Sequence, residues 1–393
     1  MKAIRLGLLP RIIIAIALGI GLGLVVPDGV TRLFLTFNAI FSQFLGFAIP
    51  LIILALVAEA IGSIGHSAGK MLLLTVAIAY GSTVFSGYLA YFTGDAIFPH
   101  LIEPGKVEQL QSAGEALTPY FTVEMPPVMG VMTALVLAFI LGLGIAHLES
   151  KALKHVIVDV KDIISDVIEK VIIPLLPLYI FGIFLEMASS GKVAGVLVVF
   201  IKIIGVIFAL HILLLLLQFT VAGVITKKNP LRLLGNMLPA YFTAMGTASS
   251  AATIPVTLAQ AKKSGASDGV ASFVVPLCAT IHLSGSTLKI VSCALALILM
   301  QGGAYDLGLF THFILLLGVT MVAAPGVPGG AIMAALAILQ SILGFTVEEQ
   351  ALMISLYITM DSFGTACNVT GDGAIAVIVD RIAGQRPGEP QNA

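Results

Sequence analysis

Six long apolar stretches constrain this sequence more than any other feature. They cover about 10–26, 34–62, 71–93, 126–148, 164–190 and 194–225. A helix needs about 20 mostly apolar residues to cross the hydrocarbon core of a bilayer, where its backbone groups must be satisfied internally. Only 10% of the residues are charged, and the mean hydropathy is +1.07. The sequence therefore predicts an all-α polytopic membrane protein whose surroundings are the lipid bilayer.

The N-terminus imitates a signal peptide, because Lys2, Arg5 and Arg11 precede the apolar residues 12–26. No small-x-small cleavage motif follows this stretch. We therefore expect it to remain in the protein as the first span.

Loop charges alternate along the chain and orient it. Basic residues occur at Lys70, at 151–170 and at 227–232, whereas the loop 94–125 holds four glutamates and one lysine. Cationic loops stay in the cytoplasm. The alternation predicts a multi-pass protein of the inner (plasma) membrane with both termini cytoplasmic.

After residue 230 the apolar runs become short and are broken by small residues. The run 236–257 contains GTASSAATIP and the run 313–343 contains APGVPGG, so that neither half of either run can span a bilayer. Broken backbone at membrane depth is tolerated only where protein or a water-filled cavity satisfies it, and a matched pair of such segments marks a transporter's binding site. We expect two re-entrant helical hairpins, the first entering from the cytoplasm and the second from outside.

The last apolar segment carries a polar stripe. Asp361, Thr365, Asn368 and Asp372 are spaced i, i+4, i+7 and i+11, which places them on one face of a helix. Two carboxylates that face the protein interior offer hard oxygen ligands to a cation or an ammonium group. The alternative is a structural polar seam between helices, although such seams favour Ser, Thr and Asn over Asp.

The segment before the second interrupted run places two basic residues on one helix face. His282 and Lys289 lie seven residues apart, and the small residues 284–286 between them would let the helix open and expose its carbonyls. Histidine titrates near neutrality, and a desolvated lysine can do so too. A satisfied interior histidine is an equally good interpretation of His282, whereas Lys289 is expected to pair with Asp361 or Asp372.

Three motifs in this order resemble the dicarboxylate/amino acid:cation symporter family, which includes the glutamate and neutral amino-acid transporters. They are the serine-rich first hairpin (Ser249, Ser250, Thr253 and Pro255), the tip GVPGG at 326–330 and the signature NVTGD at 368–372. The similarity runs over nearly the whole chain. It implies eight transmembrane helices plus two re-entrant helical hairpins, built as inverted repeats, in an elevator-type transporter that assembles as a homotrimer.

The resemblance also implies a division of the chain. Residues 1–69 (spans 1 and 2) and 96–191 (spans 4 and 5) would form a fixed scaffold. Residues 70–95 (span 3) and 192–385 (span 6, both hairpins and the last two spans) would form a mobile transport domain, followed by a disordered tail at 386–393. Substrate would lie between the hairpin tips, with the second hairpin as the extracellular gate.

Functional residues follow by position from the resemblance. Asp361 would bind the amino group of the substrate, and Asn368 with the hairpin serines would hold its α-carboxylate. The implied substrate-binding set is Ser249, Ser250, Thr253, Ser286, Lys289, Gly326, Val327, Gly329, Asp361, Gly364, Thr365 and Asn368. The implied ion-binding or coupling set is Tyr80, Thr83, Cys278, Thr280, His282, Ser284, Asn368 and Asp372. Asn368 and Asp372 are the expected ligands of a sodium ion, and no other cofactor is indicated.

Several positions depart from the family pattern. The hallmark Asn-Met-Asp-Gly-Thr is replaced by His-Leu-Ser-Gly-Ser at 282–286, which loses an amide and a carboxylate that serve sodium binding, and Val84 replaces a serine of the third span. Members with acidic substrates carry an arginine where this chain has Gly364 or Ala248, and arginine suits bidentate carboxylate binding. Fewer sodium sites and a neutral substrate are therefore expected.

These observations predict a secondary active transporter of a small amino acid. Its coupling cation would be sodium at a reduced number of sites, or a proton on His282 or Asp372. Asp361 favours an amino acid, since dicarboxylate carriers of the family usually lack this residue. Two alternatives stay open: a carrier of dicarboxylates or acidic amino acids that uses Lys289 for the second carboxylate, and a sodium-independent exchanger.

Other classes of protein fit less well. The net charge of -1 offers no surface to nucleic acid, and the three cysteines lack the spacing of a disulfide or metal site. An intramembrane aspartyl protease needs its aspartates on two helices, whereas Asp361 and Asp372 share one. We therefore expect that the protein is not an enzyme. A channel is disfavoured because two opposed hairpins close a site from both sides.

Overall fold

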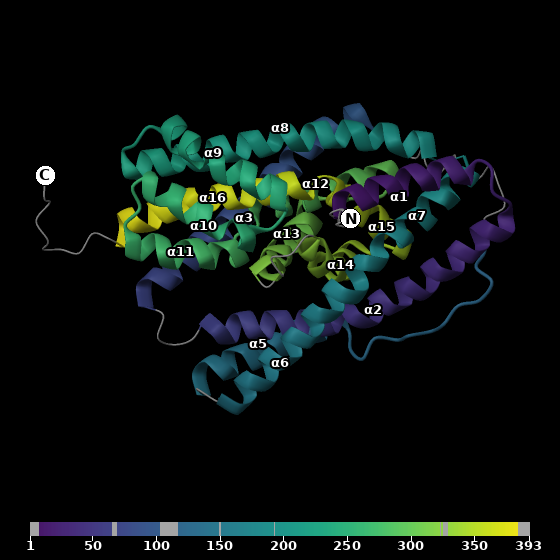
Figure 1. Ribbon diagram of the computed structural model, residues 1–393, viewed down its shortest axis with the longest axis horizontal. Helices are drawn as coiled ribbons and strands as arrows, with labels where there is room; N and C mark the ends of the chain where they lie inside the picture. The colour runs from purple at the N-terminus through teal and green to yellow at the C-terminus, as the bar shows by residue number, and fades with distance from the viewer. Residues whose placement is uncertain are drawn as a thin grey trace, which may run out of the picture.

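The computed structural model describes residues 8–64, 69–102, 117–148, 151–191, 193–322, 324 and 329–383, and the regular structure within these ranges is helical throughout. Most helices run along the long axis of an elongated molecule (Figure 1). In this part of the chain, six helices are long and apolar enough to cross a membrane. The helical structure and these apolar helices confirm the prediction of an all-α polytopic membrane protein.

One group of helices comes from the N-terminal half. It comprises α1 (Leu8–Gly23), α2 (Asp28–Ile64), α5 (Val131–Leu148), α6 (Lys151–Val167), η1 (Ile168–Ile172) and α7 (Ile173–Ser189). α2 packs against α5, α6 and α7, and α1 packs against α7. Gly19 permits this last contact, because a Cβ there would lie 2.7 Å from the carbonyl oxygen of Phe181. The helical path of the fifth span begins at Lys151 rather than near 164, since amphipathic α6 continues through the π-helical turn η1 into α7.

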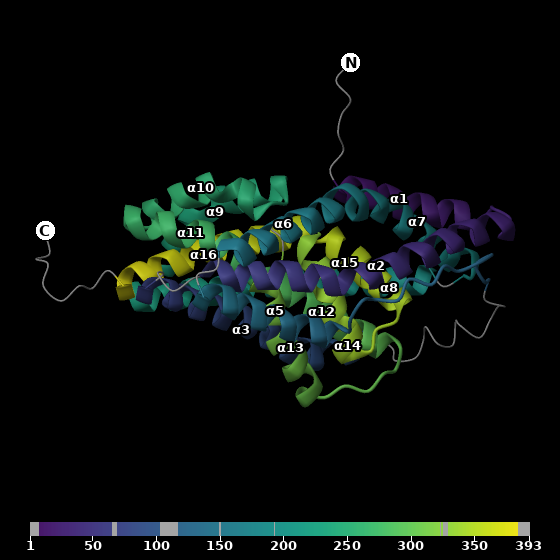
Figure 2. The ribbon, with the colours of Figure 1, turned by 90° about the horizontal axis from the view of Figure 1, so that it is seen from below.

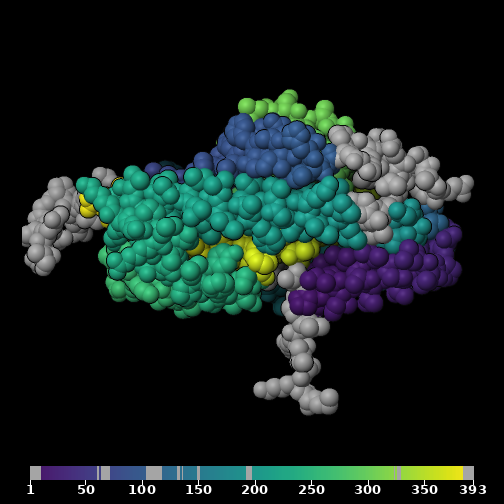
Figure 3. Space-filling view, turned by 90° about the horizontal axis from the view of Figure 1, so that it is seen from above, coloured from purple at the N-terminus to yellow at the C-terminus, as the bar shows by residue number. Residues whose placement is uncertain are grey.

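A second group contains α3 and the helices after residue 192. They are α3 (Gly69–Leu101), α8 (Val193–Thr226), α9 (Pro230–Thr247), α10 (Ser250–Lys263), α11 (Asp268–Ile281), α12 (Ser284–Met300), α13 (Leu307–Val322), α14 (Gly330–Leu343), α15 (Val347–Thr359) and α16 (Asp361–Ala383). α16 packs against α8, α9, α10, α11 and α12. Figure 3 shows α8 to α11 (teal to green) over much of one face, beside α3 (blue) and the N-terminal helices (purple), with part of α16 (yellow) visible between them.

Two helix pairs lie where the interrupted runs predicted hairpins. α9 pairs with α10 around Ala248, which has a left-handed φ of 49°, and the side chain of Ser249 caps α10. α13 pairs with α14, which follows Gly329 with its φ of 77°. Figure 2 shows α9, α10 and α11 at the end where α16 finishes, away from α1.

Two helix breaks in the second group position the site. The first lies at His282 and Leu283, between α11 and α12, and the second lies at Met360, between α15 and α16. The sequence predicted the first break two residues later, at 284–286, but these residues form the first turn of α12. The small residues are used for close packing, since a Cβ at Gly285 would lie 2.7 Å from the carbonyl oxygen of Gly364.

Candidate functional site

One buried ion pair and one buried histidine–carboxylate hydrogen bond join α16 to the broken segment α11–α12. Lys289 Nζ lies 3.4 Å from Asp361 Oδ1, and His282 Nδ1 lies 2.9 Å from Asp372 Oδ1. The exposed fraction of these four side chains is 8% or less. At 1.5 Å per residue the two carboxylates are roughly 16 Å apart along α16. Charges buried at this depth are costly and mark a functional site by default.

Asp361 connects three elements. Its Oδ2 accepts a hydrogen bond of 2.8 Å from the backbone N–H of Gly329, which precedes α14, while its Oδ1 faces Lys289. Lys289 Nζ also donates to the carbonyl oxygen of Met360 at 3.3 Å and lies 3.6 Å from the ring centroid of Tyr357. Of the two partners predicted for Lys289, the structure pairs it with Asp361. The carboxylate at the start of α16 therefore links the second hairpin to α12.

Gly364 makes room for Lys289. A Cβ at position 364 would lie 2.5 Å from Lys289 Nζ, and its three nearest heavy atoms would all belong to that lysine. Contacts below 3.0 Å require atoms to move. A side chain at Gly364 is therefore incompatible with the observed position of the ammonium group.

Asn368 caps α12 from the neighbouring helix. Its Oδ1 accepts from the backbone N–H groups of Gly285 and Ser286 at 2.8 and 3.3 Å, and its Nδ2 donates to Ser286 Oγ at 3.1 Å. Tyr357 OH donates to the same hydroxyl at 2.9 Å. The first N–H groups of a helix lack partners within it, so this one amide satisfies two of them.

Replacing Asn368 by alanine is expected to lower stability by about 1–3 kcal/mol, because two buried N–H groups lose their acceptor. Aspartate is the matched control: it keeps the acceptor Oδ1, although it loses the Nδ2 donor to Ser286, and a helix N-terminus favours negative charge. Thermal melting in detergent should place Asn368→Asp closer to the wild type than Asn368→Ala. Equal melting temperatures for the two variants would contradict the capping role.

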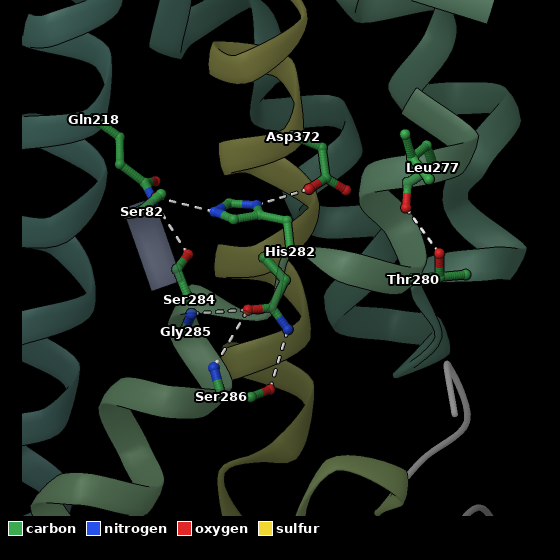
Figure 4. Close-up of polar contacts among 10 residues, drawn as sticks. Ser82, Gln218, Leu277, Thr280, His282, Ser284, Gly285, Ser286 and Asp372 are labelled. Carbon is green, nitrogen blue, oxygen red and sulfur yellow. Dashed lines mark hydrogen bonds and ion pairs between the residues drawn. The ribbon is translucent and has the colours of Figure 1, made fainter. Parts of the chain in front are cut away.

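His282 belongs to a second polar network, drawn in Figure 4. Its Nε2 lies 3.0 Å from Ser82 Oγ of α3. Gln218 of α8 donates through Nε2 to Ser82 Oγ at 2.9 Å and to Ser284 Oγ at 3.1 Å. Gly371 permits this packing, since a Cβ there would lie 2.7 Å from His282 Cε1 and 2.8 Å from Gln218 Oε1. All hydrogen-bonding nitrogens of the imidazole therefore have partners.

Sequence reasoning missed Ser82, Gln218 and Tyr357. Gln218 had a usable signal, because it is an amide inside a long apolar run of α8. Ser82 and Tyr357 had none, since a serine or tyrosine within a span is ordinary. Their roles depend on which helices pack together.

Several predicted residues have partners outside these two networks. Tyr80 OH donates to the carbonyl oxygen of Leu315 in α13, and Thr280 Oγ1 donates to Leu277 in its own helix from an exposed position. At the first hairpin tip, Thr253 Oγ1 donates to the carbonyl oxygen of Ser249. The other predicted residues Thr83, Cys278, Ser250 and Thr365 are buried. Gly326 and Val327 lie outside the described residues.

The two residues predicted to bind sodium have other partners. Asn368 Oδ1 accepts from the start of α12, and Asp372 Oδ1 faces His282. Within the described ranges, no group of three or more His, Cys, Asp or Glu side chains is arranged to hold a metal ion. The imidazole of His282 therefore contacts one of the two carboxylate oxygens of Asp372.

Comparison with known proteins gives a consistent result. The model of the sodium:dicarboxylate symporter family matches residues 8–382. The serine/threonine transporter SstT of Acinetobacter baumannii is 28% identical over 391 residues, covering 96% of this chain and 97% of the relative. An excitatory amino acid transporter of Caenorhabditis elegans is 29% identical over 267 residues, covering 66% of this chain and 52% of the relative.

Proposed function

Because this chain belongs to the sodium:dicarboxylate symporter family, we propose that it carries a small neutral amino acid across the inner membrane together with one cation. The family consists of transporters, so the protein is a multi-pass membrane transporter and not an enzyme. The amino-acid substrate is supported by the relative named as a serine/threonine transporter, which matches over nearly its whole length.

The observation that carries the proposal is the buried pair of Lys289 and Asp361 beside Gly329. An amino acid is a zwitterion, so its ammonium group complements Asp361 and its carboxylate complements Lys289. The buried site then stays neutral, which avoids the cost of an uncompensated charge. A hydrogen bond to a charged group contributes about 1.5–3 kcal/mol, enough to discriminate against an analogue without the amino group.

A dicarboxylate substrate is the second candidate, and Lys289 is the observation that favours it. Its ammonium group could bind one carboxylate, as the side chain is fully buried and lies close to the tip of the second hairpin. However, such a substrate brings two negative charges to a site that already holds Asp361. Like charges at close range in a buried site repel strongly, so the zwitterion is the better match.

The coupling cation in this proposal is a proton on the pair of His282 and Asp372. Histidine exchanges a proton in the physiological range, and the imidazole has polar partners on both nitrogens. One bound proton adds the single positive charge that one sodium ion would bring. Sodium at Asn368 and Asp372 is the competing possibility, because the family is sodium-coupled.

The proposed mechanism is an elevator. The group of α1, α2 and α5 to α7 would be the scaffold and the trimer interface, and α3 with α8 to α16 would move with the substrate. Because α3 continues to Leu101, the boundary expected between 95 and 96 falls inside this helix. Both hairpins would be re-entrant, with the second as the gate, since the Gly329 N–H bond to Asp361 couples its tip to the site. Both termini would be cytoplasmic.

Uptake into proteoliposomes tests the proposal. Labelled serine, alanine, aspartate, glutamate and succinate would be offered under a sodium gradient or a proton gradient alone. We expect serine or alanine to accumulate under an inward proton gradient, without competition from succinate. Accumulation driven only by sodium would move coupling to Asn368 and Asp372, and preferential uptake of succinate or aspartate would contradict the zwitterion model.

A further inference from the structure

Both carboxylate oxygens of Asp361 contact groups of the chain itself. Oδ2 accepts from the backbone N–H of Gly329, directly before α14, and Oδ1 faces the ammonium group of Lys289. The side chains of Asp361 and Lys289 are almost completely buried, so bulk water compensates neither charge. The negative charge is therefore balanced inside the protein by a group that also lies beside the second hairpin.

The contact between Lys289 and Asp361 neutralises the pair but is long enough to be exchanged. Its 3.4 Å exceed the separation of about 2.7–2.9 Å that is usual for a hydrogen bond between an ammonium group and a carboxylate. Lys289 Nζ has two further partners, the carbonyl oxygen of Met360 at 3.3 Å and the ring of Tyr357, whose centroid lies 3.6 Å away. A carbonyl oxygen and an aromatic face both stabilise a cation. The lysine therefore keeps two partners when another ammonium group takes its place at Asp361.

Packing holds the lysine in this position as well. A Cβ at Gly364 would lie 2.4 Å from Lys289 Cε, so the lysine stem lies directly against α16. The ring below the ammonium group is fixed in turn, because Tyr357 OH donates to Ser286 Oγ at 2.9 Å. The cation is thus placed beside Asp361 by its surroundings and not by the ion pair alone.

A carrier of zwitterions has to cross the membrane in two forms, loaded and empty. In the loaded form the substrate's ammonium group pairs with Asp361 and its carboxylate pairs with Lys289. In the empty form Asp361 would be a single buried carboxylate if no cation lay beside it, and an uncompensated buried charge is costly. A carrier without an internal cation would need an ion from outside for its return.

We propose that Lys289 is a built-in counter-cation, which replaces the substrate's ammonium group at Asp361 and lets the carrier return empty with the second hairpin closed. This role rests on the proposed function and adds the type of transport cycle, namely net uptake without a counter-transported cation or amino acid. The charge of the site is the same in both forms, because Asp361 and Lys289 sum to zero and a zwitterion adds no net charge.

Wild-type protein in proteoliposomes gives the first test. Uptake of labelled serine would be measured with an interior that holds the bulky cation N-methyl-D-glucamine alone, or with added potassium, or with added unlabelled serine. We expect the same initial rate with and without potassium, and net uptake without internal serine at no less than about a tenth of the exchange rate. A requirement for internal potassium, or slower net uptake than this, would overturn the proposal.

Lys289→Ala tests the residue itself. Its net uptake should fall at least about tenfold more than its exchange at saturating serine, because only the loaded carrier then neutralises Asp361. Internal methylammonium, which fits the space of the removed ammonium group, should restore net uptake. Lys202→Ala is the matched control and should leave the ratio of net uptake to exchange unchanged, since this lysine of α8 donates to the carbonyl oxygen of Leu101.

Equal losses of net uptake and exchange in Lys289→Ala, without rescue by methylammonium, would mean that the lysine serves substrate binding alone and would overturn the proposal. If this variant does not fold, which its melting temperature shows, the wild-type measurement decides. Failure of the proposed function appears separately, as wild-type protein that neither exchanges nor accumulates serine.

Discussion

Replacing Asp361 by asparagine is expected to abolish uptake and to destabilise the protein. The substitution removes the partner of Lys289 and leaves a buried ammonium group 3.6 Å above the Tyr357 ring without a counter-charge. Breaking a buried ion pair from one side costs about 3–5 kcal/mol. Initial uptake should fall at least a hundredfold, and the melting temperature in detergent should drop together with it.

The double variant Asp361→Asn with Lys289→Met separates the two roles of the pair. Removing both charges avoids the unpaired ammonium group, and an apolar replacement of a buried pair is often neutral for stability. The melting temperature should therefore recover, while uptake should remain lost because the substrate's ammonium group still lacks its carboxylate. Wild-type uptake by the double variant would show that the pair only supports the fold.

Much of the architecture could be predicted from periodicity and composition. Four of the six predicted runs (34–62, 71–93, 164–190 and 194–225) correspond to helices long enough to cross a membrane, whereas the runs 10–26 and 126–148 form shorter apolar helices. The clusters of Gly, Ser and Pro predicted two helix pairs at the observed places. The spacing of Asp361, Asn368 and Asp372 predicted one shared face, and these three side chains do contact the broken segment α11–α12. Helical spacing is a local property, so it can be derived without knowing the neighbours.

What could not be predicted depends on partners distant in sequence. Ser82 and His282 meet across 200 residues, and Gln218 joins them from a third helix. The first break lies at His282 and Leu283 rather than at 284–286 because Asn368 satisfies the first N–H groups of α12. A cap supplied by another helix leaves no local sequence signal, so propensity alone places the break among the small residues.

The position of the Lys289 side chain also depends on a residue distant in sequence, because Gly364 leaves the space that it occupies. The sequence gives no sign that Lys289 and Gly364 are in contact, since 75 positions separate them. The structure brings them together so closely that the space beside Gly364 is filled by the lysine side chain. An ammonium group fixed in this way can serve both as the partner of Asp361 and as a binding group for a substrate carboxylate.

Gly364→Ala is therefore expected to reduce uptake at least a hundredfold, although alanine is the better helix former by about 1 kcal/mol. The added Cβ would lie 2.5 Å from Lys289 Nζ, so the lysine has to leave its position beside Asp361. Overpacking of this kind costs about 1–3 kcal/mol in addition to the loss of the ion pair. Uptake of labelled serine and the melting temperature measure the two effects.

Gly205→Ala in α8 is the matched control, because a Cβ at that position meets no atom within 4 Å and uptake should stay unchanged. The sharper test repeats Gly364→Ala in a Lys289→Ala background. With the lysine side chain gone, the added methyl group has room, and the second substitution should have no further effect on stability. The effects of two substitutions on stability add when the sites are independent and do not add when the residues are in contact. If Gly364→Ala lowered stability equally with and without the lysine side chain, the glycine would serve the packing of α16 rather than the position of Lys289.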